Sequence, residues 1–396
     1  MNNFDVKTGA VRLASQPNLL RGLRVGLVTN YTGTVDGLAR NIDAFLAVGI
    51  NITRIFTPEH GLRGTAQAGY SEKNSHDQST NIPVFDTYGF HGPELDELVA
   101  HGHDVEAIVF DMQDIGVRYW TYTWTMFDVM ETAARLGIPF VVLDRPNPLS
   151  GSVCQGPGVE PDFSSFVGRV SIPQRHGLTS GELARLFNLS FIQQRTGTLA
   201  DLQVVALQGW RREMAFRDTG LPWVMPSPNL PTIDSVRAFA GMGLIEGTNL
   251  SEGRGTTRPF EYVGATYIDE KFAPYLRAQE LSGVLFRDAW FVPTFHKYAG
   301  QMVRGVQIHV VDESIFDPIR CALAVIGGAA TLYPQAFALS PPASETAFLE
   351  QNYPIDRLWG SQTLRRAVDD GRDLTIFDTS FVRPEEKYPD GVLMYS

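Results

Sequence analysis

Ionisable side chains gather directly after four short apolar segments in the first 145 residues. The polar stretches occupy residues 29–33, 57–64, 111–118 and 144–148. Together they contain a Glu–His pair, arginines and aspartates, which are the side chains that transfer protons and bind carboxylates. Ordinary turns account for the glycine, proline and asparagine in these stretches, but not for so many ionisable groups. We therefore interpret the four stretches as parts of one functional site.

Carboxylates are the leading catalytic candidates. Glu59 lies in the tetrapeptide Pro-Glu-His-Gly, and Asp111 and Asp114 follow the third apolar segment. Glu246 and Glu252 occur in a glycine-rich segment farther along the chain. Two carboxyl groups in a cleft suit glycoside hydrolysis, in which one of them protonates the leaving oxygen. For each carboxylate taken alone, a salt bridge or a loop cap is an equally good interpretation.

Arginine and aromatic side chains are candidates for substrate binding. A guanidinium group can hold a carboxylate through two hydrogen bonds, and the arginines considered for this role are Arg63, Arg118, Arg145 and Arg254. Aromatic rings can stack on the apolar face of a sugar, and the rings near these segments are Tyr31, Tyr119, Trp120, Tyr122 and Trp124. The same aromatic residues could equally belong to the hydrophobic core.

Other chemistries lack their usual sequence signals. No Gly-x-Gly-x-x-Gly or Walker sequence follows the first apolar segment, and no Gly-x-Ser-x-Gly turn occurs. The two cysteines, Cys154 and Cys321, are too few for a disulfide framework or an all-cysteine zinc site. His60, His176 and Asp111 could gather a metal ion, but their spacing does not require one. We expect neither a metal nor a cofactor.

Composition limits the class of protein. Hydrophobic residues make up 43% and charged residues 19% of the 396 residues, which is ordinary for a folded globular protein. The 33 lysines and arginines against 44 aspartates and glutamates give a net charge of −11, so nucleic acid is not an expected partner. No apolar stretch approaches the ~20 residues of a membrane-spanning helix, and residues 1–7 do not resemble a signal peptide. We therefore expect a cytoplasmic protein without membrane insertion.

Alternating strand and helix patterns predict an α/β fold with a Rossmann-like parallel sheet. Short apolar runs predict buried strands at residues 24–30, 52–57, 105–111, 140–144 and 202–206. Helical spacing predicts helices at residues 37–48, 123–136 and 180–188. Strands that alternate with helices form parallel sheets, whose carboxyl ends share one edge where ligands bind. The four polar stretches should therefore meet at that edge.

The pattern changes in the second half of the chain. Residues 222–264 are rich in proline and glycine and have little periodicity, which is typical of an irregular functional segment. Beyond them we expect strands at 303–311 and 387–396 and helices at 318–333 and 358–371. We interpret residues 1–266 as a Rossmann-like catalytic domain and residues 267–396 as a smaller α+β domain that closes the cleft.

Several longer motifs resemble the YbbC/NamZ family. They lie at residues 58–64, 111–122, 144–148, 226–232 and 246–256, with shorter matches at 175–183 and 305–310. The resemblance implies an exo-β-N-acetylmuramidase, which releases N-acetylmuramic acid from the non-reducing end of peptidoglycan fragments. It also implies a cleft between a Rossmann-like domain and a smaller domain, Glu59 as the catalytic acid, and no metal or cofactor. Many relatives have Glu-Gly-Pro where this chain has Gln155-Gly-Pro. If that glutamate is catalytic in those relatives, this chain has lost it or uses Glu160 instead.

Our hypothesis is that Glu59 protonates the glycosidic oxygen, while His60 orients Glu59 or binds the substrate. The second carboxylate would be Asp111, Asp114, Glu246 or Glu252, unless the acetamido oxygen of the sugar is the nucleophile. Arg118 or Arg254 would clamp the lactyl carboxylate of muramic acid. The other candidates for substrate binding are Asn30, Arg63, Gln113, Asp114, Tyr122, Arg145, Asn229 and Asn249.

Two other classes remain open at this point. A sugar-binding protein without turnover would also place two α/β domains around a cleft. An amidase or esterase acting on wall fragments would need a nucleophile or a metal, and the sequence provides a clear candidate for neither. The expected partner is a small glycan that contains N-acetylmuramic acid. The sequence leaves the oligomeric state and the stereochemical course open.

Overall fold

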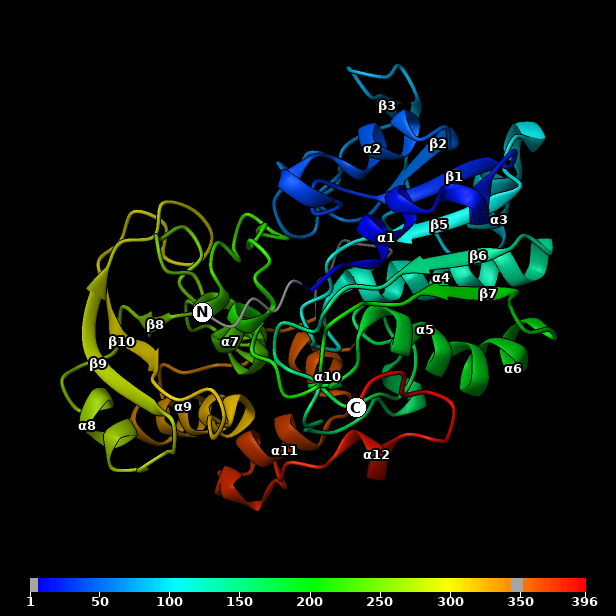
Figure 1. Ribbon diagram of the computed structural model, residues 1–396. Helices are drawn as coiled ribbons and strands as arrows, with labels where there is room; N and C mark the ends of the chain where they lie inside the picture. The colour runs from blue at the N-terminus through cyan, green and yellow to red at the C-terminus, as the bar shows by residue number, and fades with distance from the viewer. Residues whose placement is uncertain (1–5, 343–351) are drawn as a thin grey trace.

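A seven-stranded sheet organises the N-terminal part of the computed structural model, which describes residues 6–342 and 352–396 (Figure 1). The strand order is β3-β4-β2-β1-β5-β6-β7, and each neighbouring pair is parallel except β3 with β4. The carboxyl ends of β1, β2, β5 and β6 therefore lie at one edge, as predicted. The strands are β1 (Arg24–Thr29), β2 (Asn51–Thr57), β3 (Ser75–His76), β4 (Pro83–Asp86), β5 (Ala107–Asp111), β6 (Phe140–Leu143) and β7 (Leu202–Val205).

Helices cover both faces of this sheet. One face carries α1 (Gly9–Ser15) and α2 (Asn41–Ala47), and the other carries α3 (Gly92–Ala100), α4 (Thr121–Leu136) and α5 (Ser180–Phe187). Successive side chains of a strand point to opposite faces. Accordingly, Leu27 of β1 packs in the core beneath α1 and α2, and Val28 packs in the core beneath α4. A parallel sheet covered on both faces explains why its strands read as continuous apolar runs.

Local signals set the ends of two of these helices. Thr179 caps α5, because its side chain accepts a hydrogen bond from the Glu182 N–H while the Glu182 carboxylate accepts one from the Thr179 N–H. α4 ends at Gly137, whose φ of 67° is the left-handed conformation that glycine adopts without strain. After α5 the chain passes through a π-helical turn, Asn188–Ile192, into α6 (Gln193–Thr196).

A smaller antiparallel sheet organises the following part of the chain. Its strand order is β8-β10-β9, with β8 (Tyr262–Ala265), β9 (Val284–Phe291) and β10 (Val303–Val310). The helices α7 (Ile233–Met242) and α8 (Phe272–Arg277) contact β10, and both pack against α9 (Pro318–Leu332). The two sheets lie on opposite sides of the molecule, with the carboxyl ends of the parallel strands facing the second sheet (Figure 1).

The last part of the chain returns to the N-terminal sheet. It contains α10 (Pro354–Trp359), α11 (Thr363–Asp369) and α12 (Pro384–Lys387). Val382 and Cys154 exchange two backbone hydrogen bonds, and the Tyr395 hydroxyl donates to the Asp144 carboxylate. Single 3-10 turns occur at Pro17–Leu20, Asp36–Leu38, His101–His103, Pro161–Phe163, Phe216–Thr219, Gly243–Gly247 and Leu374–Ile376.

Some expectations from the sequence are wrong. Residues 222–264 are not wholly irregular, because they contain α7, which Thr232 caps by accepting a hydrogen bond from the Ser235 N–H. Residues 387–396 form no strand: Lys387 ends α12, and the residues after it pack as an irregular tail. Residues 37–48 are not one helix, because a 3-10 turn ends before α2 begins at Asn41. The sequence did not predict β9.

Two other expectations are only partly addressed. β8 already belongs to the second sheet, and the division of the chain at residue 266 stays a prediction. Within the described residues, no helix is both long and apolar enough to cross a membrane. The sequence pattern at residues 1–7 falls mostly on residues 1–5, which lie outside the described residues.

Candidate functional site

A cavity of about 540 Å³ lies where the carboxyl edge of the parallel sheet meets the C-terminal part of the chain. Glu59 and His60 line it from the loop after β2, and Thr121 from the start of α4. The opposite wall carries Glu246, Arg254 and His296. Its aromatic lining consists of Tyr70, Tyr88, Tyr119, Trp120, Phe166, Phe239, Phe260 and Phe295. An acid-bearing wall together with many aromatic rings suits a small ligand that has both polar groups and an apolar face.

Glu59 is the best-placed carboxyl group in this cavity. It is 6% exposed, and each of its oxygens accepts one hydrogen bond. Oε1 accepts from the backbone N–H of Gly69, and Oε2 accepts from the Thr121 hydroxyl at 2.7 Å. Gly69 has a φ of 85°, so the turn that aims this N–H at Glu59 uses a conformation that favours glycine. The carboxyl group is thereby held in one orientation at the cavity wall.

His60 fixes the loop that follows β2. Its φ is 73°, an uncommon value for a residue other than glycine and a form of strain found at functional sites. Its Nδ1 lies 2.8 Å from the Ala66 carbonyl oxygen, which can only accept, so Nδ1 carries the hydrogen. Its ring packs edge-on against Tyr122 and tilted against Trp120.

Glu252 forms the centre of a charge network behind the opposite wall. It is fully buried, and its oxygens lie 3.0 Å from His296 Nδ1, 3.0 Å from Lys297 Nζ and 3.3 Å from Arg254 Nε. Burial alone would raise the pKa of Glu252, but Lys297, His296 and Arg254 hold it well below its ordinary value. Glu252 is therefore ionised at neutral pH and is a poor proton donor.

Arg254 connects this network to the cavity. Its Nη2 lies 2.6 Å from Glu246, and its guanidinium group lies 5.1 Å from the ring centroid of Phe260. Burial would lower the pKa of Arg254, but the carboxylates of Glu246, Glu252 and Glu59 raise it. Within the described part of the chain, Nη1 makes no hydrogen bond. A cationic group with a free N–H pair therefore faces the cavity beside Glu246, whose side chain is 34% exposed.

Asp111 and Arg145 do not line this cavity. Arg145 donates to both oxygens of Asp111, at 2.7 and 3.1 Å, and Asn41 donates to Asp111 at 2.7 Å. Asp111 is fully buried, and its carboxylate is occupied by Arg145 and Asn41. Gln113 lies nearby and donates to the carbonyl oxygens of Asp114 and Pro146, also away from the Glu59 cavity.

Asp114 and Arg118 have structural partners. Asp114 accepts from the Gly116 N–H and the Thr123 hydroxyl and lies 3.2 Å from His176. Arg118 donates to the carbonyl oxygens of residues 357–359, which anchors α10 to the N-terminal part. Burial away from any carboxylate lowers the pKa of Arg118 to about 10.

The remaining candidates also hold loops together. The Tyr122 hydroxyl donates to the Pro226 carbonyl, and Asn229 donates to Gln67, which does line the cavity. Asn30 accepts from Thr32, Asn249 bonds to the backbone of residues 336 and 338, and the exposed Arg63 pairs with Glu72. Of the candidates named from the sequence, the structure brings six together in the cavity, with Glu252 directly behind them: Glu59, His60, Tyr119, Trp120, Glu246 and Arg254.

His296 is the main functional candidate that the sequence did not reveal. Its side chain is 45% exposed and lines the cavity, while its Nδ1 is held by Glu252. It follows no strand-end motif, and it lies 44 residues beyond Glu252 in the chain, so neither motif nor spacing identified it. Gln155 does not line the cavity, since it is buried and donates to the Thr379 carbonyl. Glu160 is exposed outside the cavity.

The fold and the cavity define a class of α/β protein with an acid-bearing, aromatic cavity at the carboxyl edge of a parallel sheet. The N-terminal family model of the exo-β-N-acetylmuramidase NamZ matches residues 25–234, and the C-terminal model of the same enzyme matches residues 237–395. The chain therefore belongs to the NamZ family.

Relatives agree with this assignment. The chain is 41% identical over 371 residues to the peptidoglycan β-N-acetylmuramidase NamZ of Bacillus subtilis (strain 168), covering 93% of this chain and 85% of that protein. Two crystal structures of DUF1343 family proteins from Bacteroides fragilis NCTC 9343 are similar in fold. One has a TM-score of 0.82 at 31% identity, over 99% of this chain and all of that one. The other has a TM-score of 0.70 at 25% identity, over 94% of this chain and 92% of that one.

Proposed function

We propose that this protein is an exo-β-N-acetylmuramidase that removes terminal N-acetylmuramic acid from peptidoglycan fragments, with Glu59 as its general acid. The observation that carries the proposal is the position of Glu59. Among the predicted carboxylates at the strand ends, it alone lines the cavity. Membership of the NamZ family supports the reaction, and the aromatic lining supports a sugar as the substrate.

The proposed reaction begins with proton transfer from Glu59 to the glycosidic oxygen. The bond between that oxygen and the anomeric carbon then breaks, and the alcohol leaves with the proton. Water adds to the anomeric carbon, and its proton returns to the Glu59 carboxylate. Thr121 and the Gly69 N–H keep the carboxyl group aimed at one point throughout these steps.

Recognition of the lactyl carboxylate is proposed for Arg254 and His296. N-acetylmuramic acid differs from N-acetylglucosamine by this carboxylate, so a specific enzyme needs a donor that the glucosaminide cannot use. Within the described residues Arg254 Nη1 makes no hydrogen bond, and His296 Nε2 is left for a ligand because Nδ1 faces Glu252 at 3.0 Å. Glu252 acts through these two residues and positions them, because it is fully buried and does not itself line the cavity.

Two candidates remain for the group that assists at the anomeric carbon. Glu246 is the second carboxylate that lines the cavity, and its ion pair with Arg254 holds it in place. The acetamido oxygen of the substrate could serve instead, in which case Glu59 is the sole essential acid. Glu246→Gln separates the two, because it should abolish turnover only in the first case.

The proposal is tested with chromogenic β-N-acetylmuramide and β-N-acetylglucosaminide substrates. The protein should release the leaving group from the muramide, and Glu59→Gln should lower kcat by orders of magnitude while the sugar still binds. Glu160→Gln is the matched control, since Glu160 is an exposed glutamate outside the cavity. Full muramide activity in Glu59→Gln would remove Glu59 from the acid role. No turnover by the unaltered protein, with binding retained, would favour a sugar-binding protein.

A further inference from the structure

A second cavity, of about 690 Å³, lies at the same edge of the parallel sheet but over different strands. Thr32 and Thr34 line it after β1, Gln113 after β5, and Arg145 after β6. In the strand order, β2 lies on one side of β1 and β5 on the other, so the chain reverses its direction of winding at this point. Such a switch point is where open parallel sheets bind ligands.

Arg145 presents a prepared hydrogen-bond donor to this cavity. Its Nε and Nη2 are fixed by Asp111, and Nη2 also donates to the Thr34 carbonyl at 3.0 Å. Its Nη1 makes no hydrogen bond within the described residues. Asp111 balances the charge of Arg145, so the ion pair as a whole is neutral. Its Nη1 therefore offers the cavity an oriented N–H donor without adding net charge.

Acceptors lie beside this donor. Both known hydrogen bonds of the Gln113 side chain are made by Nε2, which leaves its Oε1 available. The Thr34 hydroxyl also makes no hydrogen bond within the described part of the chain, and it can donate or accept. At the rim, the exposed Lys7 and Asp36 carry opposite charges. The cavity therefore offers donors and acceptors while remaining neutral overall.

An aromatic wall faces these polar groups. Trp223 and Phe216 both line the cavity, and their rings meet edge to face with centroids 5.2 Å apart. The indole N–H of Trp223 donates to the Leu230 carbonyl at 3.3 Å, which fixes the ring in the wall. A rigid indole opposite hydrogen-bonding groups suits a ligand that has one apolar face and a polar edge.

We infer that this second cavity binds a neutral sugar ring, with N-acetylglucosamine as the simplest representative. Its hydroxyl and amide groups match Arg145, Gln113 and Thr34, and its apolar face matches Trp223. A phosphate group would need net positive charge, which the Arg145–Asp111 pair does not supply. A cavity of this size holds a small molecule comfortably. The inference does not depend on the hydrolysis proposed for the Glu59 cavity.

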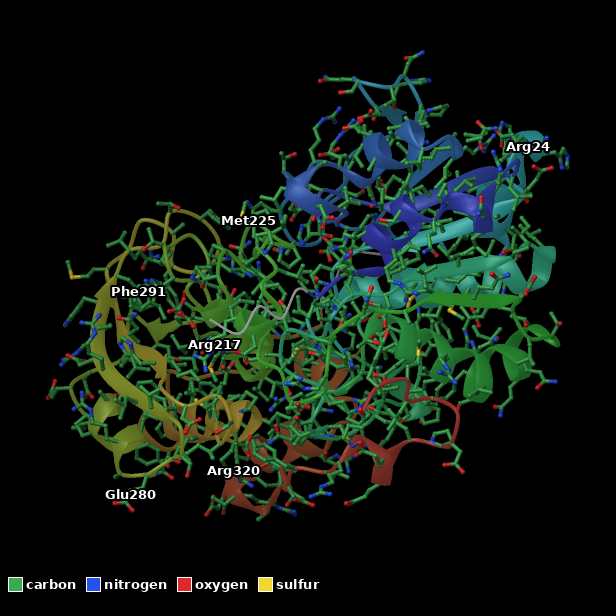
Figure 2. All side chains as sticks on the ribbon, in the orientation of Figure 1. Arg24, Arg217, Met225, Glu280, Phe291 and Arg320 are labelled. Atoms are coloured by element: carbon green, nitrogen blue, oxygen red, sulfur yellow. The ribbon has the colours of Figure 1, made fainter. Side chains whose placement is uncertain are left out.

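The two cavities are separated by the segment 222–230. Trp223 lines the second cavity, whereas Ser227 and Leu230 line the first. The Tyr122 hydroxyl holds this segment by donating to the Pro226 carbonyl. Met225 lies in the same segment, where the N-terminal and C-terminal parts of the molecule approach each other (Figure 2). Because each cavity has its own lining residues, a signal from one of those residues tells which cavity a ligand occupies.

The tryptophans provide the means to do so. The chain has six, of which Trp120 lines the first cavity, Trp223 lines the second, and Trp290 is 57% exposed on β9. The full chain labelled with 5-fluorotryptophan gives one fluorine signal for each, assigned by single Trp→Phe substitutions. Titration with N-acetylglucosamine should shift the Trp223 signal in a saturable manner and leave the Trp290 signal unchanged.

Two variants of Thr34 complete the experiment. Thr34→Tyr fills the second cavity while keeping the backbone hydrogen bonds of residue 34, and it should abolish the shift at Trp223. Thr34→Val removes only the hydroxyl and should weaken binding by about fivefold to tenfold. A sugar-dependent shift at Trp120 alone, or at neither tryptophan, would overturn the inference. A Trp223 shift caused by inorganic phosphate and not by the sugar would overturn the assigned class of ligand.

Discussion

Replacing Glu252 by glutamine should strongly destabilise the protein, because Glu252 is the shared counter-ion of three cationic side chains. Its carboxylate is fully buried and lies 3.0 to 3.3 Å from His296, Lys297 and Arg254. Removing one partner of a buried ion pair costs about 3–5 kcal/mol. Lys297 keeps three backbone carbonyl partners and Arg254 keeps Glu246, so we expect the lower end, about 3 kcal/mol at pH 7.

The effect should depend on pH with a defined sign. The pKa of Glu252 is lowered in the folded protein, so its stabilising contribution is fully present above the unfolded pKa, near 4.5. The contribution is lost as the pH falls from 4.5 through the folded pKa. The difference in unfolding free energy between the unaltered protein and Glu252→Gln should therefore be constant near neutral pH and shrink below pH 4.5.

Urea denaturation followed by tryptophan fluorescence measures this difference, and Glu261→Gln provides a matched control. Glu261 is also buried, but its one ion pair within the described residues is with Arg258, and burial raises its pKa. The charged form of Glu261 is therefore disfavoured in the folded state, and its replacement should change stability little or increase it at pH 7. A loss below about 1 kcal/mol in Glu252→Gln, or one equal to that in the control, would refute the reasoning.

Three further predictions concern single side chains. Arg254→Lys keeps the charge but loses the guanidinium fork, so kcat/KM for the muramide should fall by about tenfold to a hundredfold while that for the glucosaminide changes little; equal losses on both substrates would contradict a role in lactyl recognition. Thr121→Val removes the hydrogen bond to Glu59, so kcat should fall by about fivefold to tenfold in steady-state assays with KM nearly unchanged. Burial raises the pKa of Asp144 to about 7, so this carboxyl lowers stability as the pH rises from 4 to 7. Thermal unfolding of Asp144→Asn should lack that decline, and an unchanged pH profile would exclude Asp144 as its source.

The sequence predicted the edge of the sheet but not the direction of each side chain at that edge. Glu59 and Arg145 follow parallel strands and Asp111 ends one, so the strand pattern alone places all three at one edge. Glu59 turns toward the C-terminal part, whereas Asp111 and Arg145 pair with each other over β1 and β5. This difference depends on the turns after each strand and on the neighbours that the fold provides, which no local pattern contains.

Long-range contacts account for the remaining differences. Glu252 was a reasonable catalytic candidate in a glycine-rich segment, but its role depends on His296 and Lys297, which arrive from a distant loop. Gln155 departs from the family pattern, yet its buried contact with the Thr379 carbonyl lies outside the cavity. The sequence therefore predicted the strands best, because their signals are local. It predicted least well the roles of side chains whose partners are distant in the sequence.

The last residues of the chain form hydrogen bonds with the N-terminal part of the protein, which is synthesised much earlier. Tyr395 donates to Asp144 at the end of β6 across 251 positions, and the Met394 N–H donates to Glu182 across 212. Contacts this distant in sequence slow folding, because a long loop must close before they form. During synthesis, the Asp144 carboxylate therefore lacks its Tyr395 partner until this segment has been made. Deleting residues 382–396 should consequently impair the N-terminal sheet, although they lie farthest from it along the chain.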